Sequence, residues 1–184
     1  MRPGRQQGND SMDGRSIYRG RVVTLDLVPV TLPNGHRFEL EVVGHPGGAA
    51  VVALNDRDEV CLVHQYRHVA DAWLWELPAG KLDAGTPLDN ARRELAEEAG
   101  LRAGHWSSLG RYLSSPGVFR EVVHLVLARD LEPCASGLEA DEVLSVHWLP
   151  LADACRMAIR GDIVDGKTVV ALWRAQAGGA TELT

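Results

Sequence analysis

Apolar residues in this chain gather in short runs of strand length, separated by turn-forming residues. An Asn-Gly pair at 34–35 separates two of these runs, and such a pair is typical of a β-hairpin. Pro29 lies inside the first of the two and predicts an edge position or a bulge, because proline donates no backbone hydrogen bond. The predicted strands are 22–31, 37–43, 49–54, 60–66, 106–113, 122–128 and 143–148.

Helical periodicity follows in three places, which are 87–99, 151–159 and 164–177. The strands and helices do not alternate regularly as in a βα repeat. This order predicts an α/β fold in which helices cover both faces of a mixed sheet, an α/β/α sandwich. The polar segment 130–140 is predicted to be a loop.

The helix at 87–99 has clear signals at both ends. Thr86 is the predicted N-cap, Pro87 occupies the first helical position, and Asp89 completes an Asp variant of the capping box. Gly100 is the predicted C′ residue. Four small or apolar side chains share one face and are expected to contact a core: Leu88, Ala91, Leu95 and Ala99.

Three acidic residues of this helix, Glu94, Glu97 and Glu98, are three and four positions apart and therefore share another face. Two interpretations are open. An acidic helix face is often simply solvated, and like charges at this spacing cost only a few tenths of a kcal/mol per pair. A cluster of carboxylate oxygens is also what Mg²⁺ prefers.

The longer pattern separates the two. Residues 93–101, RELAEEAGL, with Gly80 upstream, resemble the Nudix box of the Nudix hydrolases at every specified position of its second half. The resemblance extends over about 17–177 and implies the same α/β/α fold. One departure is present: the first Glu of the box is missing, as if deleted between Gly85 and Thr86. Asp83 and Asp89 are the candidates to replace it as a partner of Arg93.

The resemblance implies hydrolysis of a nucleoside diphosphate linked to another moiety, with a divalent metal ion as cofactor. It implies Mg²⁺, with Mn²⁺ as a possible substitute, bound directly by Glu94 and Glu98, directly or through water by Glu97, and by the carbonyl oxygen of Ala79. Glu97 and Arg93 belong to the implied catalytic machinery. The implied general base is a Glu in a later loop, Glu142 or, as second choice, Glu139; the alternative is that this loop is merely acidic and solvated.

Within the family, the chain is similar to the ADP-ribose pyrophosphatases and their nucleotide-sugar relatives. Pro116, sixteen residues after Gly100, lies at the position of a Pro associated with ADP-ribose hydrolysis, although Ser-Pro-Gly is also an ordinary turn. Arg67 is a candidate phosphate or ribose contact; the alternative is a pair with a carboxylate. Tyr18 is a candidate to stack on the base, or else a core residue.

Glu41 corresponds to a Glu that these relatives often precede with a substrate-contacting Arg, but Leu40 stands here. The expected reaction is therefore hydrolysis of ADP-ribose to AMP and ribose 5-phosphate. The alternatives are another nucleoside diphosphate sugar such as GDP-mannose, or a CDP-alcohol. A nucleotide-binding sensor without turnover is the alternative of a different class.

Composition narrows the partners and the compartment. The net charge of −6 gives no basic surface for nucleic acid, and three cysteines without a CxxC pair suggest neither a disulfide framework nor a zinc site. No apolar run approaches the length of a membrane span, so we expect a cytoplasmic protein. We expect a disordered tail at 1–15, a strand region at 16–48, a Nudix domain at 49–178 and a frayed end at 179–184. The resemblance implies a homodimer joined through the N-terminal strands.

Overall fold

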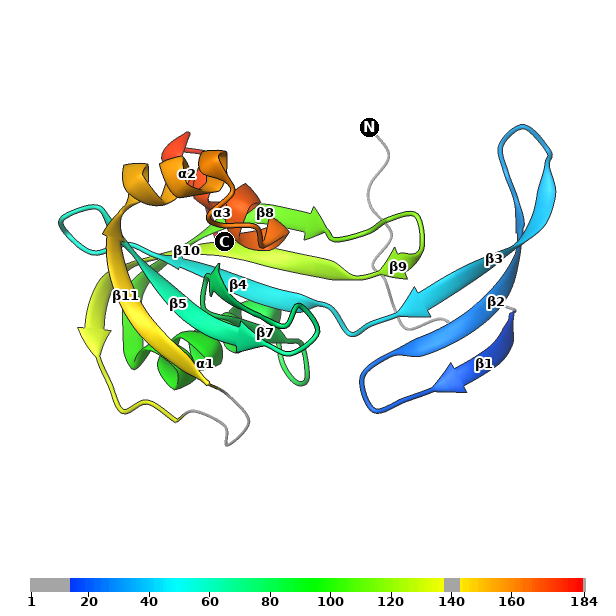
Figure 1. Ribbon diagram of the computed structural model, residues 1–184, viewed down its shortest axis with the longest axis horizontal. Helices are drawn as coiled ribbons and strands as arrows, with labels where there is room; N and C mark the ends of the chain where they lie inside the picture. The colour runs from blue at the N-terminus through cyan, green and yellow to red at the C-terminus, as the bar shows by residue number, and fades with distance from the viewer. Residues whose placement is uncertain (1–13, 138–142, 184) are drawn as a thin grey trace. The chain divides into compact units, whose positions relative to one another are not determined.

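The computed structural model describes residues 14–137 and 143–183, and Figure 1 shows its strands and helices. These residues form two compact units. The N-terminal unit comprises the described part of Met1–His45 together with Ser115–Arg120. The main unit comprises Pro46–Ser114 and the described part of Glu121–Thr184.

A single sheet in the order β1-β2-β3-β9 makes up the N-terminal unit. Its strands are β1 (Arg15–Arg19), β2 (Thr24–Thr31), β3 (Arg37–Gly44) and β9 (Phe119–Arg120). The predicted hairpin is confirmed: the N–H of Gly35 donates to the carbonyl of Leu32 at 2.8 Å, and Gly35 has a φ of 83°. Pro29 faces Glu39 on one side, whereas the β1 ladder reaches only Leu27 on the other, so the expected edge position is also confirmed.

The main unit holds a mixed five-stranded sheet in the order β12-β8-β10-β4-β7 and an antiparallel three-stranded sheet in the order β11-β5-β6. The strands are β4 (Gly48–Ala53), β5 (Glu59–Arg67), β6 (Ala72–Glu76), β7 (Ala79–Lys81), β8 (Leu101–Leu113), β10 (Val122–Pro133), β11 (Leu144–Pro150) and β12 (Thr181–Glu182). The helices are α1 (Pro87–Ala99), α2 (Leu151–Arg160) and α3 (Gly166–Gln176).

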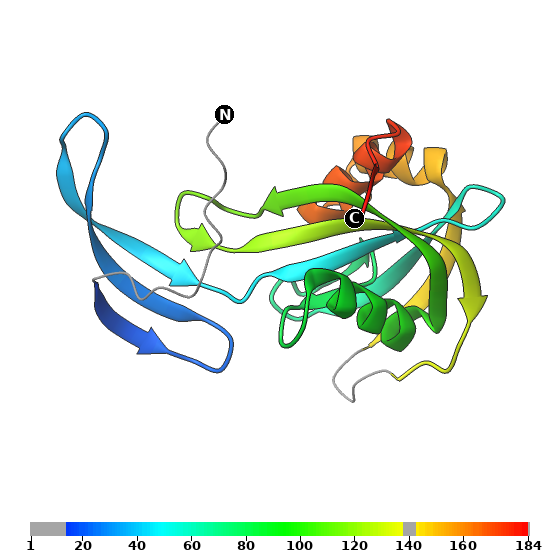
Figure 2. The ribbon, with the colours of Figure 1, turned by 180° about the vertical axis from the view of Figure 1, so that it is seen from behind.

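Strand β4 is the centre of the unit, since every one of its residues is buried. Successive side chains of a strand point to opposite faces. Val51 accordingly belongs to one apolar cluster with Leu95 of α1, and Val52 belongs to another with Leu172 of α3. Figures 1 and 2 show α1 on one side of the sheets and α2 with α3 on the other. The predicted α/β/α arrangement is confirmed, but two sheets form the strand layer where one was expected, joined by an isolated bridge between Leu54 and Val60.

Two expectations for loops were wrong. Strand β10 continues to Pro133, into the predicted loop 130–140, because β8 already begins at Leu101 and pairs with it there. Leu131 packs against the α1-side cluster, which rewards that extension. At the C-terminus, Thr181 and Glu182 do not fray but pair with Ser108 and Ser107 of β8.

No helix in the described ranges is long and apolar enough to cross a membrane.

Candidate active site

Helix α1 begins directly after the loop that follows β7, and its capping fixes that junction. The side chain of Thr86 accepts from the N–H of Asp89 at 3.2 Å, and the carboxylate of Asp89 accepts from the N–H of Thr86 at 2.9 Å. Pro87 occupies the first turn, and Gly100 ends the helix with a φ of 63°. The predicted capping box and C′ glycine are confirmed, and they set which residues of α1 face the turn before it.

The glutamates of α1 do not form a solvated face. Glu94 is only 6% exposed and Glu98 only 4%, whereas Glu97 is about one-third exposed. A buried carboxylate is costly unless it is paired or hydrogen-bonded. The burial of two of the three therefore requires partners, which the turn and Arg93 supply.

The turn between β6 and β7 contacts both buried carboxylates. The N–H of Ala79 donates to Oε2 of Glu98 at 3.0 Å. Gly80 lies so close to Glu94 that a methyl group on its Cα would overlap the Glu94 carboxylate. The absence of a side chain at Gly80 therefore makes the room that Glu94 occupies.

Arg93 joins the other ends of this acidic group. Its Nη1 donates to Oε2 of Glu97 at 2.9 Å, and its Nη2 lies 2.8 Å from Oε1 of Glu94. The same Nη2 lies 3.0 Å from Oδ1 of Asn90 and 3.3 Å from Oδ1 of Asp83. One guanidinium thus holds two of the three glutamates and anchors them to the loop before the helix.

A second set of charges lies at the end of β6. Glu76 is 2% exposed, and its carboxylate accepts from Nε and Nη2 of Arg67 at 2.8 and 2.9 Å and from Nζ of Lys167 at 2.6 Å. Burial alone would raise the pKa of Glu76, but the hydrogen bonds from Arg67 and the charge of Lys167 outweigh it and lower the pKa to about 2. Glu76 is therefore an anion at neutral pH, and it orients Arg67.

The N-terminus of α3 supports the same region. Asp165 caps the helix by accepting from the N–H of Thr168 at 3.0 Å, and its carboxylate lies 3.0 Å from Nζ of Lys167. The hydroxyl of Thr168 accepts from the N–H of Leu77 at 2.9 Å. Two consecutive residues, Glu76 and Leu77, are thus tied to α3 just before the turn that faces α1.

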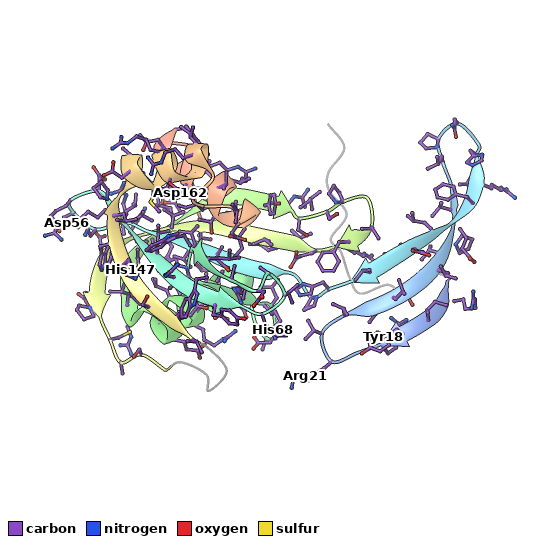
Figure 3. The ribbon with its side chains drawn as sticks, viewed as in Figure 1. Tyr18, Arg21, Asp56, His68, His147 and Asp162 are labelled. Atoms are coloured by element: carbon purple, nitrogen blue, oxygen red, sulfur yellow. The ribbon has the colours of Figure 1, made fainter. Side chains whose placement is uncertain are left out.

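The remaining residues predicted for the site lie elsewhere. Tyr18 is an exposed residue of β1, labelled in Figure 3, Glu41 is an exposed residue of β3, and Pro116 begins an exposed turn in which the N–H of Val118 donates to the carbonyl of Ser115. All three belong to the N-terminal unit. The expectation that Tyr18 is either a stacking residue or a core residue is narrowed, since 56% exposure excludes the core. Glu139 and Glu142 lie outside the described residues.

The donor atoms beside the turn are suited to a hard divalent cation. Carboxylate and carbonyl oxygens are the ligands that Mg²⁺ takes, and the space left open by Gly80 brings the Glu94 carboxylate against the backbone that carries the Ala79 carbonyl. Within residues 14–137 and 143–183, no group of three or more His, Cys, Asp or Glu side chains is gathered closely enough to hold a metal ion. The carboxylates are instead engaged by Arg93 and by the Ala79 N–H.

Comparison with known proteins identifies this arrangement. The model of the NUDIX domain matches residues 44–172, which include the turn, α1 and both charge groups. The chain belongs to the Nudix hydrolase family.

Relatives and a solved structure agree with this membership. The chain is 37% identical to an ADP-ribose pyrophosphatase of Mycobacterium tuberculosis, over 91% of this chain and 83% of the relative. It is 35% identical to a GDP-mannose pyrophosphatase of Klebsiella pneumoniae, over 78% and 77% of the two chains. The crystal structure of an ADP compounds hydrolase superposes with a TM-score of 0.77 at 23% identity, over 92% of this chain and 96% of that chain, and supports the fold.

In this Nudix hydrolase, the box lacks its first Glu, and the structure separates the two residues that were candidates to replace it. Asp89 is engaged in the capping box of α1, whereas Asp83 pairs with Arg93. Asn90 also contacts Arg93, and sequence reasoning missed it, as it missed Glu76, Lys167 and Thr168. The one signal for Asn90 is an amide next to the apolar stripe of a helix, and for Glu76 and Lys167 the partners are 91 residues apart.

Proposed function

We propose that this Nudix hydrolase adds water across the diphosphate of ADP-ribose in the presence of Mg²⁺ and releases AMP and ribose 5-phosphate. The observation that carries the proposal is the burial of Glu94 and Glu98 against the turn at Ala79 and Gly80. Two carboxylates are kept out of water there without being neutralised by a matching number of cations. The name of the M. tuberculosis relative supports ADP-ribose as the substrate.

In this proposal Glu94, Glu97, Glu98 and the carbonyl of Ala79 hold Mg²⁺, and Mn²⁺ is an acceptable substitute. A bound divalent ion neutralises diphosphate charge and lowers the pKa of an attacking water. Glu97 is the residue placed to change partner, because its carboxylate is partly exposed and is paired with Arg93 rather than buried. Arg93 then holds Glu94 and Glu97 at a fixed separation.

Arg67 is the proposed contact for a phosphate of the substrate. Its guanidinium can engage phosphate oxygens while Glu76 holds it by Nε and Nη2. Glu142, with Glu139 as second choice, is the proposed general base, which removes a proton from the attacking water. Tyr18, Glu41 and Pro116 remain proposed substrate contacts on the strength of the family resemblance.

A second substrate class has a specific observation in its favour. Leu40 stands where ADP-ribose hydrolases often carry an Arg before the Glu corresponding to Glu41. Together with the named activity of the K. pneumoniae relative, this makes GDP-mannose the main competitor, with a CDP-alcohol as a further candidate. A sensor without turnover is disfavoured, because a pure binder has no need of Glu94, Glu97 and Glu98 together. We also propose that the protein is a cytoplasmic homodimer.

The test is a hydrolysis panel of ADP-ribose, GDP-mannose and a CDP-alcohol with Mg²⁺, with Mn²⁺ and with EDTA. We expect ADP-ribose to give the highest kcat/KM and EDTA to abolish turnover. Glu98→Gln keeps an acceptor for the Ala79 N–H but removes the charge, so we expect kcat to fall by about 100-fold or more. The control is Glu132→Gln, an exposed glutamate of β10, which leaves kcat unchanged. Failure to cleave any of the three would end the proposal, and an active Glu98→Gln variant would refute the metal assignment.

A further inference from the structure

The loop between β7 and α1 is one residue shorter than the Nudix pattern, and the residue lost is the first Glu of the box. The loop nevertheless holds a defined shape next to Arg93. Asn90, in the first turns of α1, is 1% exposed and lies against this loop. Its role follows from what its amide contacts.

Every hydrogen-bonding position of the Asn90 amide is used. Its Nδ2 donates to the carbonyls of Ala84 and Thr86 at 2.8 and 3.1 Å. Its Oδ1 accepts from Nη2 of Arg93 at 3.0 Å and from the N–H of Asp83 at 3.4 Å. An asparagine amide has two donor hydrogens and one oxygen with two lone pairs, so the set is complete. Turning the amide over would set donors against donors and acceptors against acceptors, so its orientation is fixed.

Arg93 extends this set to the proposed metal ligands. The same Nη2 that bonds Asn90 lies 2.8 Å from Glu94, and Nη1 bonds Glu97 at 2.9 Å. One continuous series of contacts therefore runs from the loop backbone through Asn90 and Arg93 to two carboxylates. Asp83 adds only a weak contact, because its side chain is 65% exposed and lies 3.3 Å from Arg93. Exposed ion pairs at such distances are screened by water.

We propose that Asn90 replaces the missing box Glu as the positioning residue of this centre. It holds the shortened loop and Arg93 together, and through Arg93 it sets Glu94 and Glu97 for metal binding. Asn90 contacts neither the proposed metal nor the substrate. The inference rests on the proposed function for the identity of the ligands, but not on the identity of the nucleotide.

Two variants separate the parts of this role. Asn90→Leu fills a similar volume and removes all four hydrogen bonds. Asn90→Asp keeps an acceptor for Arg93 but loses the donors to Ala84 and Thr86. The matched control is Asn55→Leu, because Asn55 fixes the β4–β5 turn in the same way, by accepting from the N–H groups of Arg57 and Glu59 at 2.9 and 3.0 Å.

The readouts are Mn²⁺ binding without nucleotide, followed by electron paramagnetic resonance, the Mg²⁺ concentration for half-maximal turnover, and Tm. We expect Asn90→Leu to weaken Mn²⁺ binding and raise the Mg²⁺ requirement by about tenfold, with a substrate KM within about twofold at saturating Mg²⁺. Asn90→Asp should lower Tm but keep Mn²⁺ affinity within about threefold of wild type. Asn55→Leu should lower Tm and leave Mn²⁺ affinity unchanged.

A folded Asn90→Leu variant with wild-type Mn²⁺ affinity would overturn the inference. So would an Asn55→Leu variant that loses Mn²⁺ to the same extent, since the effect would then be a general consequence of lower stability. Wild-type protein that binds Mn²⁺ but hydrolyses nothing in the substrate panel would refute the proposed function alone.

Discussion

At the scale of single residues, the candidate site depends on groups that are small or buried rather than on groups that are conspicuous in the sequence. Gly80 makes room for Glu94 by having no side chain, and Glu76 holds two cations while almost inaccessible to water. Each side chain has a consequence that can be measured separately.

Gly80→Ala places a methyl group where the Glu94 carboxylate lies. We expect Glu94 to be displaced, with a loss of Mn²⁺ affinity and a fall of about 100-fold in kcat, because misplacing a metal ligand is costly. The measurements are Mn²⁺ titration and steady-state kinetics. Gly117→Ala is the control for stability, since nothing lies within 4 Å of its added methyl group. Unchanged Mn²⁺ affinity in Gly80→Ala would show that Glu94 does not bind the metal.

Glu76 gives the protein a defined loss of stability in acid. Its pKa in the folded protein is about 2, below the value near 4.3 of an unperturbed Glu, so its contribution is present above the unfolded pKa and is lost as the pH falls toward 2. The difference corresponds to about 3 kcal/mol of unfolding free energy. Glu76→Gln should be destabilised by roughly 3–5 kcal/mol at pH 7, since it leaves two partly buried cations without their anion.

Denaturant unfolding between pH 2 and pH 6 tests this. The wild-type free energy of unfolding should fall through that range, and the Glu76→Gln profile should be flatter. Glu132→Gln, at an exposed position, should follow the wild-type curve. Parallel profiles for wild type and Glu76→Gln would mean that Glu76 does not titrate with a lowered pKa.

At the scale of elements, two helices define the turn that carries Ala79 and Gly80. Helix α1 faces it with the glutamates, and the N-terminus of α3 fixes the two residues before it through Lys167 and Thr168. The turn is therefore held from both sides of the strand layer. Its geometry depends on the docking of α3 as much as on the box.

Thr168→Val removes the acceptor of the Leu77 N–H without a change of volume. A buried N–H left without a partner costs about 1–3 kcal/mol. We expect that loss in unfolding free energy, together with a several-fold lower kcat, because the turn loses one of its two ties to α3. Thr181→Val, at an exposed position of β12, should change neither quantity. Wild-type stability in Thr168→Val would show that water replaces the lost bond.

At the scale of the whole molecule, the residues predicted to contact substrate come from both units. Arg67 and the glutamates belong to the main unit, whereas Tyr18, Glu41 and Pro116 belong to the N-terminal unit. The N-terminal unit is a sheet with exposed apolar residues, among them Ile17 and Phe38. Such surface is commonly covered by a partner.

We therefore expect the full chain to be a homodimer. Light scattering coupled to size-exclusion chromatography should give a mass of about 40 kDa, twice the 20.0 kDa of one chain. The mass should stay constant on dilution through the micromolar range, as expected for an interface of standard size or larger. A mass of one chain at every concentration would contradict this prediction.

The sequence by itself determined the features that depend on neighbouring residues. Thr86, Pro87 and Gly100 predicted both ends of α1, the Asn-Gly pair predicted the β2–β3 hairpin, and the box predicted the family. Helix caps and tight turns are stabilised within a few residues, so they can be recognised in a linear pattern. The same holds for the spacing of Glu94, Glu97 and Glu98.

Only the tertiary structure decided how those residues are held. Burial of Glu94 and Glu98, the space at Gly80 and the Lys167–Glu76–Arg67 contacts all join segments far apart in the chain. The extension of β10 to Pro133 likewise depended on a partner, the early start of β8. Burial and strand pairing arise when distant segments meet, and a pattern of neighbours does not specify which distant segment that is.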